Sequence, residues 1–346
     1  MRRASPQELG GWDGLVAENP DGGQILQTRA WGEFKRAHRW APEYLVSDSG
    51  QRVAILELRH SVPGLGVLGY VPKGPGVTAV AELPALLEGL RATAGSAFVI
   101  KVEPEIAQSA AAVAALREMG LEKSRHDVQI SRATIIVDLR PDEEAMLASF
   151  KPKCRYNIRL AQRRGVTVAP VALEATSIDT MYALMASTRD RAGFTLRSKE
   201  YFAQYWQLHA AAGQGQLFFA SLDGAVLAGV FATYIGRKAW YKDGGSTKEH
   251  ASVMAPHLLQ WEVMRWLRAR GVEAYDLVAV PPAAELNPSH PLFGLYRFKS
   301  GFSDQITEYV GTWDLPLQRR RFAAWNAVAE RAAHQWAYRV RHDLLY

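Results

Sequence analysis

The sequence has 346 residues, of which 48% are hydrophobic and 22% charged, and this balance excludes a largely disordered chain. Its net charge of +6 favours a polyanionic partner such as nucleic acid, a phosphorylated metabolite or an acidic membrane surface. The single cysteine, Cys154, excludes an internal disulfide and a cysteine-based zinc site, and no apolar run reaches the roughly eighteen residues that span a bilayer.

In the first half of the chain, the apolar pattern predicts a β-hairpin, a strand, a helix and a second strand in that order. Residues 44–60 alternate apolar and polar residues on either side of an Asp-Ser-Gly turn, which predicts the hairpin. A strand at 67–71 then leads into the glycine-bearing loop 72–76. Residues 83–95 have helical spacing, and residues 97–104 predict the closing strand.

The second half repeats this order. A hairpin is predicted at 217–236 around Asp-Gly. The strand that follows, within 239–247, runs into a glycine-bearing loop that starts at Gly244 and Gly245. A helix follows at 254–271, and the strand at 273–280 closes the unit. This repeat predicts an α+β fold with two mixed sheets, the order expected of tandem GNAT-like (acyl-CoA N-acyltransferase-like) domains.

We expect the boundary near Pro141, which precedes an acidic first helical turn. The first GNAT-like domain is predicted to comprise residues 1–141 plus 316–346, and the second residues 142–315. A GNAT domain that binds acetyl-CoA grips the pyrophosphate with a Q/R-x-x-G-x-G/A loop that opens a helix, and neither half contains this motif. If the fold is correct, the acyl group must come from another carrier, and we expect no cofactor.

The C-terminal tail predicts one long helix with an apolar face that includes Phe322, Trp325 and Trp336. Its basic, tryptophan-bearing character is compatible with contact with the inner face of a membrane, and equally with docking on the first domain. Because the first residues lack the apolar core of a signal peptide, we expect a cytoplasmic protein, and a monomer by default. The basic tail is compatible with a peripheral position on the inner face of the membrane.

Four segments resemble the FemABX family of peptidyltransferases, which build the interpeptide bridge of bacterial peptidoglycan from aminoacyl-tRNA. They follow the family's order and span nearly the whole chain. No charged heptad segment like the family's coiled-coil arm is visible, so the resemblance is to the short, FemX-like form. The segments are QTRAWGEFK at 27–35, YVPKGP at 70–75, KCRYNIRLAQRRGV at 153–166 and YRFKSGFSDQITEYVGTWDLPL at 296–317.

The resemblance implies roles for six residues. Phe298 and Lys299 match the family's catalytic Phe-Lys pair, and a lysine there would stabilise the oxyanion that forms when an amine attacks the ester of aminoacyl-tRNA. From the local sequence alone, Lys299 would be a solvated loop lysine. The residues that match the family's contacts to the sugar-nucleotide precursor are Lys35, Arg197, Tyr201 and Tyr241.

These substrate residues have simpler alternatives. Without the resemblance, the local sequence predicts that Lys35 is a solvated lysine in the first turn of a helix. It likewise predicts that Tyr201 and Tyr241 are aromatic residues of the core or its rim. Lys151, Arg155 and Arg159 recur every four residues and predict a cationic face on one helix. Such a face is usually solvated, but here it is a candidate contact for the tRNA acceptor end.

The general base is not identified. The family often has Asp-Pro at the end of the first domain's strand, where this chain has Glu103 and Pro104. Glu103 is also compatible with a strand-end salt bridge, and Asp276 is equally ambiguous.

The resemblance implies transfer of an amino acid from aminoacyl-tRNA to the side-chain amine at position 3 of the peptidoglycan stem. The acceptor would be UDP-MurNAc-pentapeptide or lipid II. Two rivals remain open at this stage: an acyl-CoA-dependent N-acyltransferase acting on another amine, and an RNA-binding module that uses the cationic helix.

Overall fold

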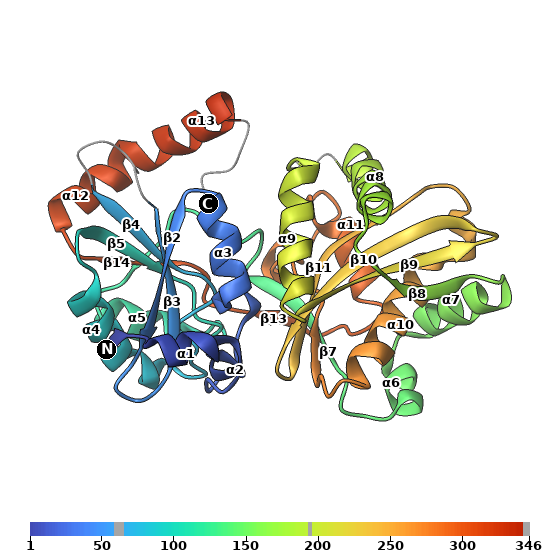
Figure 1. Cartoon of the computed structure of the whole chain (residues 1–346), viewed down its shortest axis with the longest axis horizontal. Coiled ribbons are helices and arrows are strands. Elements are labelled where there is room, and N and C mark those ends of the chain that lie inside the picture. Colours follow the sequence, from blue (N-terminus) through green and yellow to red (C-terminus); the bar gives the residue numbers. More distant parts are fainter. Residues whose placement is uncertain (59–65, 193–195, 342–346) are drawn as a thin grey trace. The chain divides into compact units, whose positions relative to one another are not determined.

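The computed structural model describes residues 1–58, 66–192 and 196–341 (Figure 1). The chain divides into two compact units, residues 1–132 with 308–346 (unit 1) and residues 133–307 (unit 2). Residues 342–346 of the expected first domain and the side chain of Trp336 lie outside the described part.

Unit 1 combines a sheet with covering helices, and its elements come from both ends of the chain. Its strands are β1 (Arg2–Arg3), β2 (Trp40–Val46), β3 (Arg52–Leu58), β4 (Val67–Val71), β5 (Ala97–Val102), β6 (Glu122–Lys123) and β14 (Trp313–Pro316). Its helices are α1 (Pro6–Gly10), α2 (Trp12–Ala17), η1 (Ile25–Gln27), α3 (Arg29–Ala37), η2 (Val80–Glu82), α4 (Leu83–Thr93), α5 (Ala110–Glu118), α12 (Arg319–Ala324), the π-helical η5 (Trp325–Ala329) and α13 (Glu330–Arg341).

Unit 2 has the same kind of architecture. Its strands are β7 (Ala133–Asp138), β8 (Thr167–Val171), β9 (Gly215–Leu222), β10 (Ala225–Ile235), β11 (Lys238–Ser246), β12 (Ala274–Asp276) and β13 (Ile306–Glu308), the last of which ends in unit 1. Its helices are α6 (Glu143–Ser149), α7 (Pro152–Arg163), α8 (Ala175–Ala192), α9 (Lys199–Ala211), η3 (Ala251–Val253), α10 (Ala255–Arg268), η4 (Ala283–Glu285) and α11 (Phe293–Lys299).

The predicted repeat is confirmed. Within the described residues, the strand orders are β1-β2-β3-β4-β5-β14-β6 and β13-β7-β12-β11-β10-β9-β8. Each sheet has an antiparallel hairpin, β2–β3 or β9–β10, followed by a parallel pair, β4–β5 or β11–β12. The two parallel pairs are joined by α4 and α10, because a parallel connection needs a long crossover. The fold is therefore α+β with two mixed, GNAT-like sheets.

The unit boundaries lie earlier in the chain than residues 141 and 316. The reason is the pairing of β7, which we had placed in the first domain. Tyr275 of β12 faces Val137 of β7 in an antiparallel ladder, so β7 belongs to the sheet of unit 2. A strand's sheet depends on a partner far away in sequence, and the local signal at Pro141 marks only the next helix.

The strand predicted at 273–280 is interrupted. β12 ends at Asp276, and the backbone then meets β7 again, with Leu277 N–H donating to Ile135 and Val280 N–H to Ala133. One residue of β7, Thr134, lies between those acceptors, whereas two residues, Val278 and Ala279, lie between the donors, so the strand carries a one-residue β-bulge. The bulge places Val278 and Ala279 at φ 59° and 25°.

The predicted C-terminal helix is present as α12, η5 and α13, and Figure 1 labels the first and the last of these. The middle segment, η5, is a π-helical turn. Phe322 and Trp325 are buried, and the Trp325 ring lies 5.6 Å from the ring of Phe98 in β5. The tail therefore packs on the sheet of unit 1 through these two side chains. No helix in the described part of the chain is long and apolar enough to cross a membrane.

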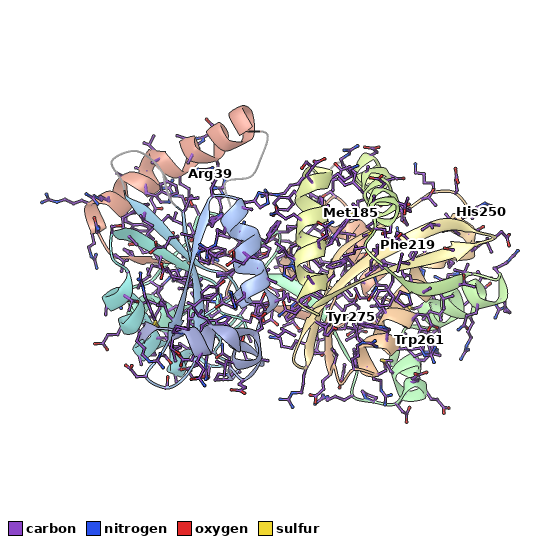
Figure 2. All side chains as sticks on the ribbon, in the orientation of Figure 1. Arg39, Met185, Phe219, His250, Trp261 and Tyr275 are labelled. Atoms are coloured by element: carbon purple, nitrogen blue, oxygen red, sulfur yellow. The ribbon has the colours of Figure 1, made fainter. Side chains whose placement is uncertain are left out.

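Gly245 of β11 is needed for the packing of α8. A Cβ at this position would lie 2.4 Å from the carbonyl carbon of Leu184 and 2.5 Å from the amide nitrogen of Met185, which Figure 2 labels. Because both are backbone atoms, no rotamer change relieves the overlap. We expect Gly245→Ala to lower the free energy of unfolding by about 3 kcal/mol, at the upper end of the cost of overpacking.

Urea unfolding checks this expectation, with Gly294→Ala as the matched control. A Cβ on Gly294 meets nothing within 4 Å, and Gly294 lies in α11, so alanine there should be neutral or stabilising. Equal midpoints for the two variants would contradict the packing argument.

Candidate active site

Lys299 is the last residue of α11 and is buried, with 4% of its surface exposed. Its Nζ donates hydrogen bonds to the carbonyl oxygens of Val278 at 2.7 Å and Ala279 at 3.1 Å, the two residues of the bulge after β12. The alternative of a solvated loop lysine is therefore wrong, because the side chain is enclosed and hydrogen-bonded.

The following turn anchors this helix end. Phe302 is 1% exposed, and Gly301 accepts the N–H of Lys151 at the start of α7. A Cβ on Gly301 would lie 3.2 Å from Cβ of Cys154, so glycine allows the turn to approach α7 closely. The Lys-Ser-Gly-Phe sequence thus fixes Lys299 by anchoring the residues after it.

Burial lowers the pKa of Lys299 to about 7, and the nearby carboxylate of Asp276 opposes this shift. An ammonium out of water is costly, so the neutral amine becomes accessible near neutral pH. The tertiary structure therefore gives this lysine a titration range that enzymes use for acid–base and electrostatic roles.

Tyr241 lies beside Lys299. Its ring centroid is 5.6 Å from Lys299 Nζ, and burial raises the pKa of its hydroxyl to about 12. A Cβ on Gly244 would lie 2.1 Å from the Tyr241 hydroxyl oxygen, so only glycine leaves room for the ring. The structure thus brings together three of the predicted site residues: Lys299, its neighbour Phe298, and Tyr241.

Phe298 is half-buried and packs edge-to-face against His257 of α10, with ring centroids 5.1 Å apart. Nδ2 of Asn157, in α7, lies 3.1 Å from Nε2 of His257. Burial, with a smaller contribution from Lys153, lowers the pKa of His257 to about 4, so this imidazole is neutral at physiological pH. Neither His257 nor Asn157 was singled out from the sequence, because a lone His and a lone Asn on helical faces give no signal.

Arg197 and Tyr201 form a separate pair at the start of α9. The Arg197 guanidinium carbon lies 4.4 Å from the Tyr201 ring centroid, a cation–π contact, and Ser198 between them caps the helix. The Arg197 carbonyl oxygen accepts the hydroxyl of Tyr182 of α8. The predicted four-residue spacing therefore places both side chains together, and their role in substrate binding stays a prediction.

The cationic residues of α7 differ in exposure. Lys151 and Arg159 are exposed, whereas Arg155 is half-buried, and its Nη1 donates to the carbonyl oxygens of Ala148 and Phe150. Arg155 therefore holds the end of α6 as well as adding charge. Contact of these three residues with tRNA stays a prediction.

Lys35, in unit 1, is buried in the last turn of α3, not solvated in the first turn. Its Nζ lies 5.2 Å from the ring centroid of Trp31 and 5.5 Å from that of Trp40. Two indole faces provide a cation–π environment for the charge. The role of Lys35 in binding the precursor stays a prediction.

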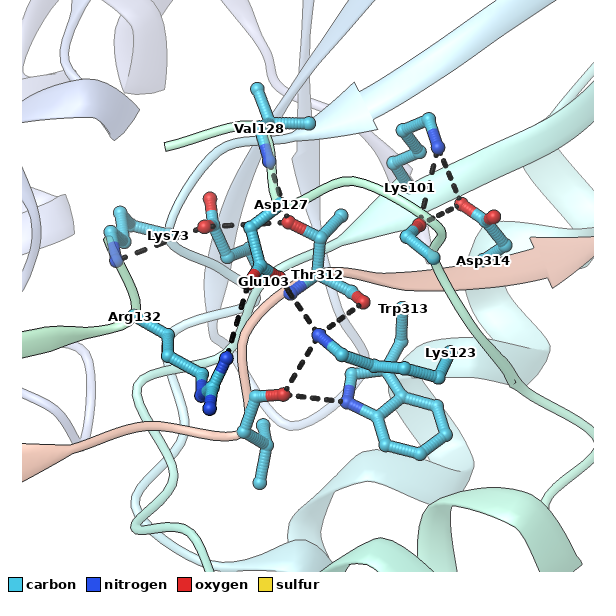
Figure 3. A network of polar contacts seen from close by, with 12 residues as sticks. Lys73, Lys101, Glu103, Lys123, Asp127, Val128, Arg132, Thr312, Trp313 and Asp314 are labelled. Atoms are coloured by element: carbon cyan, nitrogen blue, oxygen red, sulfur yellow. Dashed lines mark hydrogen bonds and ion pairs between the residues drawn. The ribbon is translucent and has the colours of Figure 1, made fainter. Parts of the chain in front are cut away.

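Glu103 belongs to a polar network in unit 1 that Figure 3 shows. It is 1% exposed and accepts the hydroxyl of Tyr70 at 2.7 Å, and Lys73 Nζ lies 3.8 Å away. Burial raises the pKa of this carboxyl, and the Lys73 cation works against that rise. Glu103 is thus an enclosed carboxyl that accepts from a tyrosine and forms a strand-end salt bridge with Lys73, as the alternative interpretation expected, and a role as general base stays a prediction.

The start of α10 is poorly suited to a pyrophosphate. We expected Gly244 and Gly245 to form the loop before this helix, but both lie within β11. At the helix start, Pro256 has no N–H, and the His257 N–H already donates to the Met254 carbonyl. A CoA pyrophosphate relies on several free N–H groups at this place, so the geometry agrees with the missing glycine motif.

The chain is similar in sequence to a known domain family and to known enzymes. The model of the acetyltransferase (GNAT) domain family matches residues 149–300. The chain is 28% identical over 335 residues to a UDP-N-acetylmuramoylpentapeptide-lysine N(6)-alanyltransferase of Weissella viridescens, covering 92% of this chain and 96% of that protein. It is 24% identical over 388 residues to a lipid II:glycine glycyltransferase of Staphylococcus aureus (strain MRSA252), covering 89% and 91% of the two chains.

Among solved structures, the chain resembles the crystal structure of FemX with a TM-score of 0.82 and 21% identity, covering 95% of this chain and 100% of that one. A second likeness is to the C-terminal domain of a putative lysylphosphatidylglycerol synthetase from Agrobacterium fabrum, with a TM-score of 0.53 and 14% identity, covering 93% and 96%. Both likenesses describe the fold over nearly the full length of this chain, and the TM-score is higher for the first.

Proposed function

We propose that this chain, which belongs to the FemABX family, is an aminoacyltransferase that moves an amino acid from aminoacyl-tRNA to the side-chain amine at position 3 of the peptidoglycan stem peptide. The product would be a precursor carrying the first residue of an interpeptide bridge. The observation that carries the mechanism is the enclosure of Lys299 by two backbone carbonyls.

In this reaction the amine nitrogen attacks the ester carbonyl carbon of the donor, and negative charge develops on the carbonyl oxygen. The new C–N bond forms, the bond to the ribose oxygen breaks, and the proton lost by the amine is matched by one gained by that oxygen. Two of the three N–H bonds of the Lys299 ammonium are directed at Val278 and Ala279, and the third is left for the developing oxyanion.

An ester of tRNA fits the donor side better than a thioester of CoA. The start of α10 offers few free N–H groups for a pyrophosphate, whereas α7 presents exposed cations, Lys151 and Arg159, to a phosphate backbone. An aminoacyl ester is already activated, so the transfer needs neither ATP nor a metal ion. Phe298, beside Lys299, would shape the acyl pocket.

On the acceptor side, we assign Lys35, Arg197, Tyr201 and Tyr241 to the peptidoglycan precursor. The acceptor is UDP-MurNAc-pentapeptide or lipid II. For the second of these, the basic C-terminal helix would rest on the inner face of the membrane. We expect a cytoplasmic monomer.

The test is mass spectrometry of both acceptors after incubation with the protein, bulk tRNA, aminoacyl-tRNA synthetases, ATP to charge the tRNA, and mixed amino acids. We expect one acceptor to gain the mass of one or more aminoacyl residues, and the gain to disappear after ribonuclease treatment. The mass identifies the amino acid, and the acceptor that reacts identifies the substrate.

Calorimetry with CoA tests the acyl-CoA alternative, whose acceptor is another amine. CoA binding without any tRNA-dependent mass gain would support that alternative and overturn the proposed reaction. Neither mass gain nor CoA binding, together with RNA binding that survives Lys299→Met, would favour the RNA-binding alternative and overturn the proposed reaction.

A further inference from the structure

The bulge after β12 has an unusual backbone. Val278 and Ala279 are consecutive non-glycine residues at positive φ, 59° and 25°. A β-branched residue in this region is an outlier, since its side chain crowds the backbone. Such strain persists only where the surrounding structure holds it, and it is concentrated at functional sites.

The strain directs two carbonyl groups at one amine. In a regular strand, successive carbonyls point in opposite directions, so two adjacent ones cannot bind the same donor. In the bulge, the carbonyls of Val278 and Ala279 both accept from Lys299 Nζ, at 2.7 Å and 3.1 Å. The bulge is therefore a cradle that fixes both the position and the orientation of the amine.

Asp276 holds this cradle from its β12 side. One oxygen of its carboxylate, Oδ1, accepts the N–H of Val278 at 2.6 Å and also the hydroxyl of Thr134 in β7. The same carboxylate is the neighbouring group that favours the charged form of Lys299. Two other titratable groups lie around Lys299 and Asp276: Tyr275 of β12, which Figure 2 labels, and Tyr241 of β11. Burial raises the pKa of both hydroxyls.

From this geometry we propose that Asp276 is a positioning residue for the acyl transfer, acting through the bulge to place Lys299 and through its charge to keep it cationic. The assignment rests on the proposed function. Asp276 itself touches no reacting atom, so its effect is on the rate of transfer at saturating substrate and not on acceptor binding.

The experiment compares Asp276→Asn with the wild type across pH. Asparagine keeps the oxygen that accepts from Val278 and Thr134 but removes the charge, so Lys299 should lose its proton at lower pH in the variant. We expect kcat of the variant to be roughly tenfold below wild type at about pH 8 and within about twofold at about pH 6, with an unchanged KM for the acceptor. The attacking amine of the acceptor also titrates, but it does so equally for both enzymes. The ratio of variant to wild-type kcat at each pH therefore reports on the enzyme alone.

Two further variants separate charge from structure. Asp276→Ala removes the hydrogen bonds as well, so its loss of activity should persist at low pH. Asp223→Asn makes the same change at the exposed tip of the β9–β10 hairpin and should match the wild type at every pH. A kcat ratio for Asp276→Asn that does not vary with pH would overturn the proposal, as would full activity of Asp276→Ala.

A second readout does not depend on activity. In protein made with lysine carrying ¹³C at Cε, the signal lost in Lys299→Met identifies Lys299, and its titration can be followed by NMR. We expect the midpoint to move to lower pH in Asp276→Asn, and an unmoved midpoint would overturn the electrostatic role. If the wild type transfers no amino acid, the proposed function fails, while this titration still decides whether Asp276 acts on Lys299.

Discussion

Replacing Lys299 with methionine is expected to reduce the rate of aminoacyl transfer by roughly 100–1000-fold, the range seen when one oxyanion donor is removed from an active site. Methionine has a similar length and no charge, so it fills the space in α11 without supplying an N–H group. The loss should appear in kcat at saturating acceptor, because the oxyanion exists only in the transition state.

The same variant should fold. The carbonyls of Val278 and Ala279 lose a donor, which costs about 1–3 kcal/mol for a buried group, but the variant also avoids the cost of burying an amine whose pKa burial lowers to about 7. These effects oppose one another, so we expect little change in unfolding midpoint. Lys238→Met, at the start of β11, is the matched control and should keep full activity.

The pH dependence gives the sign of the charge effect. With a pKa of about 7, Lys299 is a cation below that pH and a neutral amine above it. If the cation is the active form, the ratio of wild-type to Lys299→Met rates is largest below about pH 7 and declines as the pH rises through that value. A ratio that instead grows above this pH would show that the neutral amine is the active form, and Lys299 would then be a base.

The repeated fold was predictable because each of its elements has a local signal. Alternation around Asp-Ser-Gly and Asp-Gly predicted the two hairpins, and helical spacing predicted α10. The boundaries were not predictable in the same way, because β7 belongs to the sheet of unit 2 through its neighbours β12 and β13, both far along the chain.

The cradle of Lys299 gave no sequence signal. Leu277, Val278, Ala279 and Val280 have the composition of a continuous strand, and β-branched residues argue against positive φ. The bulge exists because its hydrogen bonds to β7, Asp276 and Lys299 outweigh that local preference. Lys299 and Phe298 were found only through a resemblance, which marks a position but does not say that the lysine is buried.

The largest stability effect that we expect is at Lys101, a residue that sequence reasoning did not single out. Its side chain is fully buried in β5, with Nζ 2.9 Å from Asp314 Oδ1 and 3.1 Å from Glu330 Oε1. Asp314 and Glu330 are themselves 1% and 2% exposed. These partners are more than two hundred residues away in the chain, which is why no local pattern reveals the cluster.

Lys101→Met should lower the free energy of unfolding of unit 1 by about 3–5 kcal/mol, since it leaves two buried carboxylates without their shared cation. Glu330 is the first residue of α13, so the same change should release the C-terminal helix from the sheet. Glu330→Gln is the matched variant: it also breaks the ion pair to α13 but leaves Lys101 with Asp314, so it should cost clearly less.

Urea unfolding measures the first effect, and hydrogen exchange of α12, η5 and α13 measures the second. If the cluster docks the tail, exchange in these helices rises in Lys101→Met well below the unfolding midpoint, while α10 of unit 2 keeps its protection. Loss of stability without faster exchange in the tail would mean that Phe322 and Trp325 hold the helix by apolar packing alone, and that Lys101 serves only the sheet beneath it.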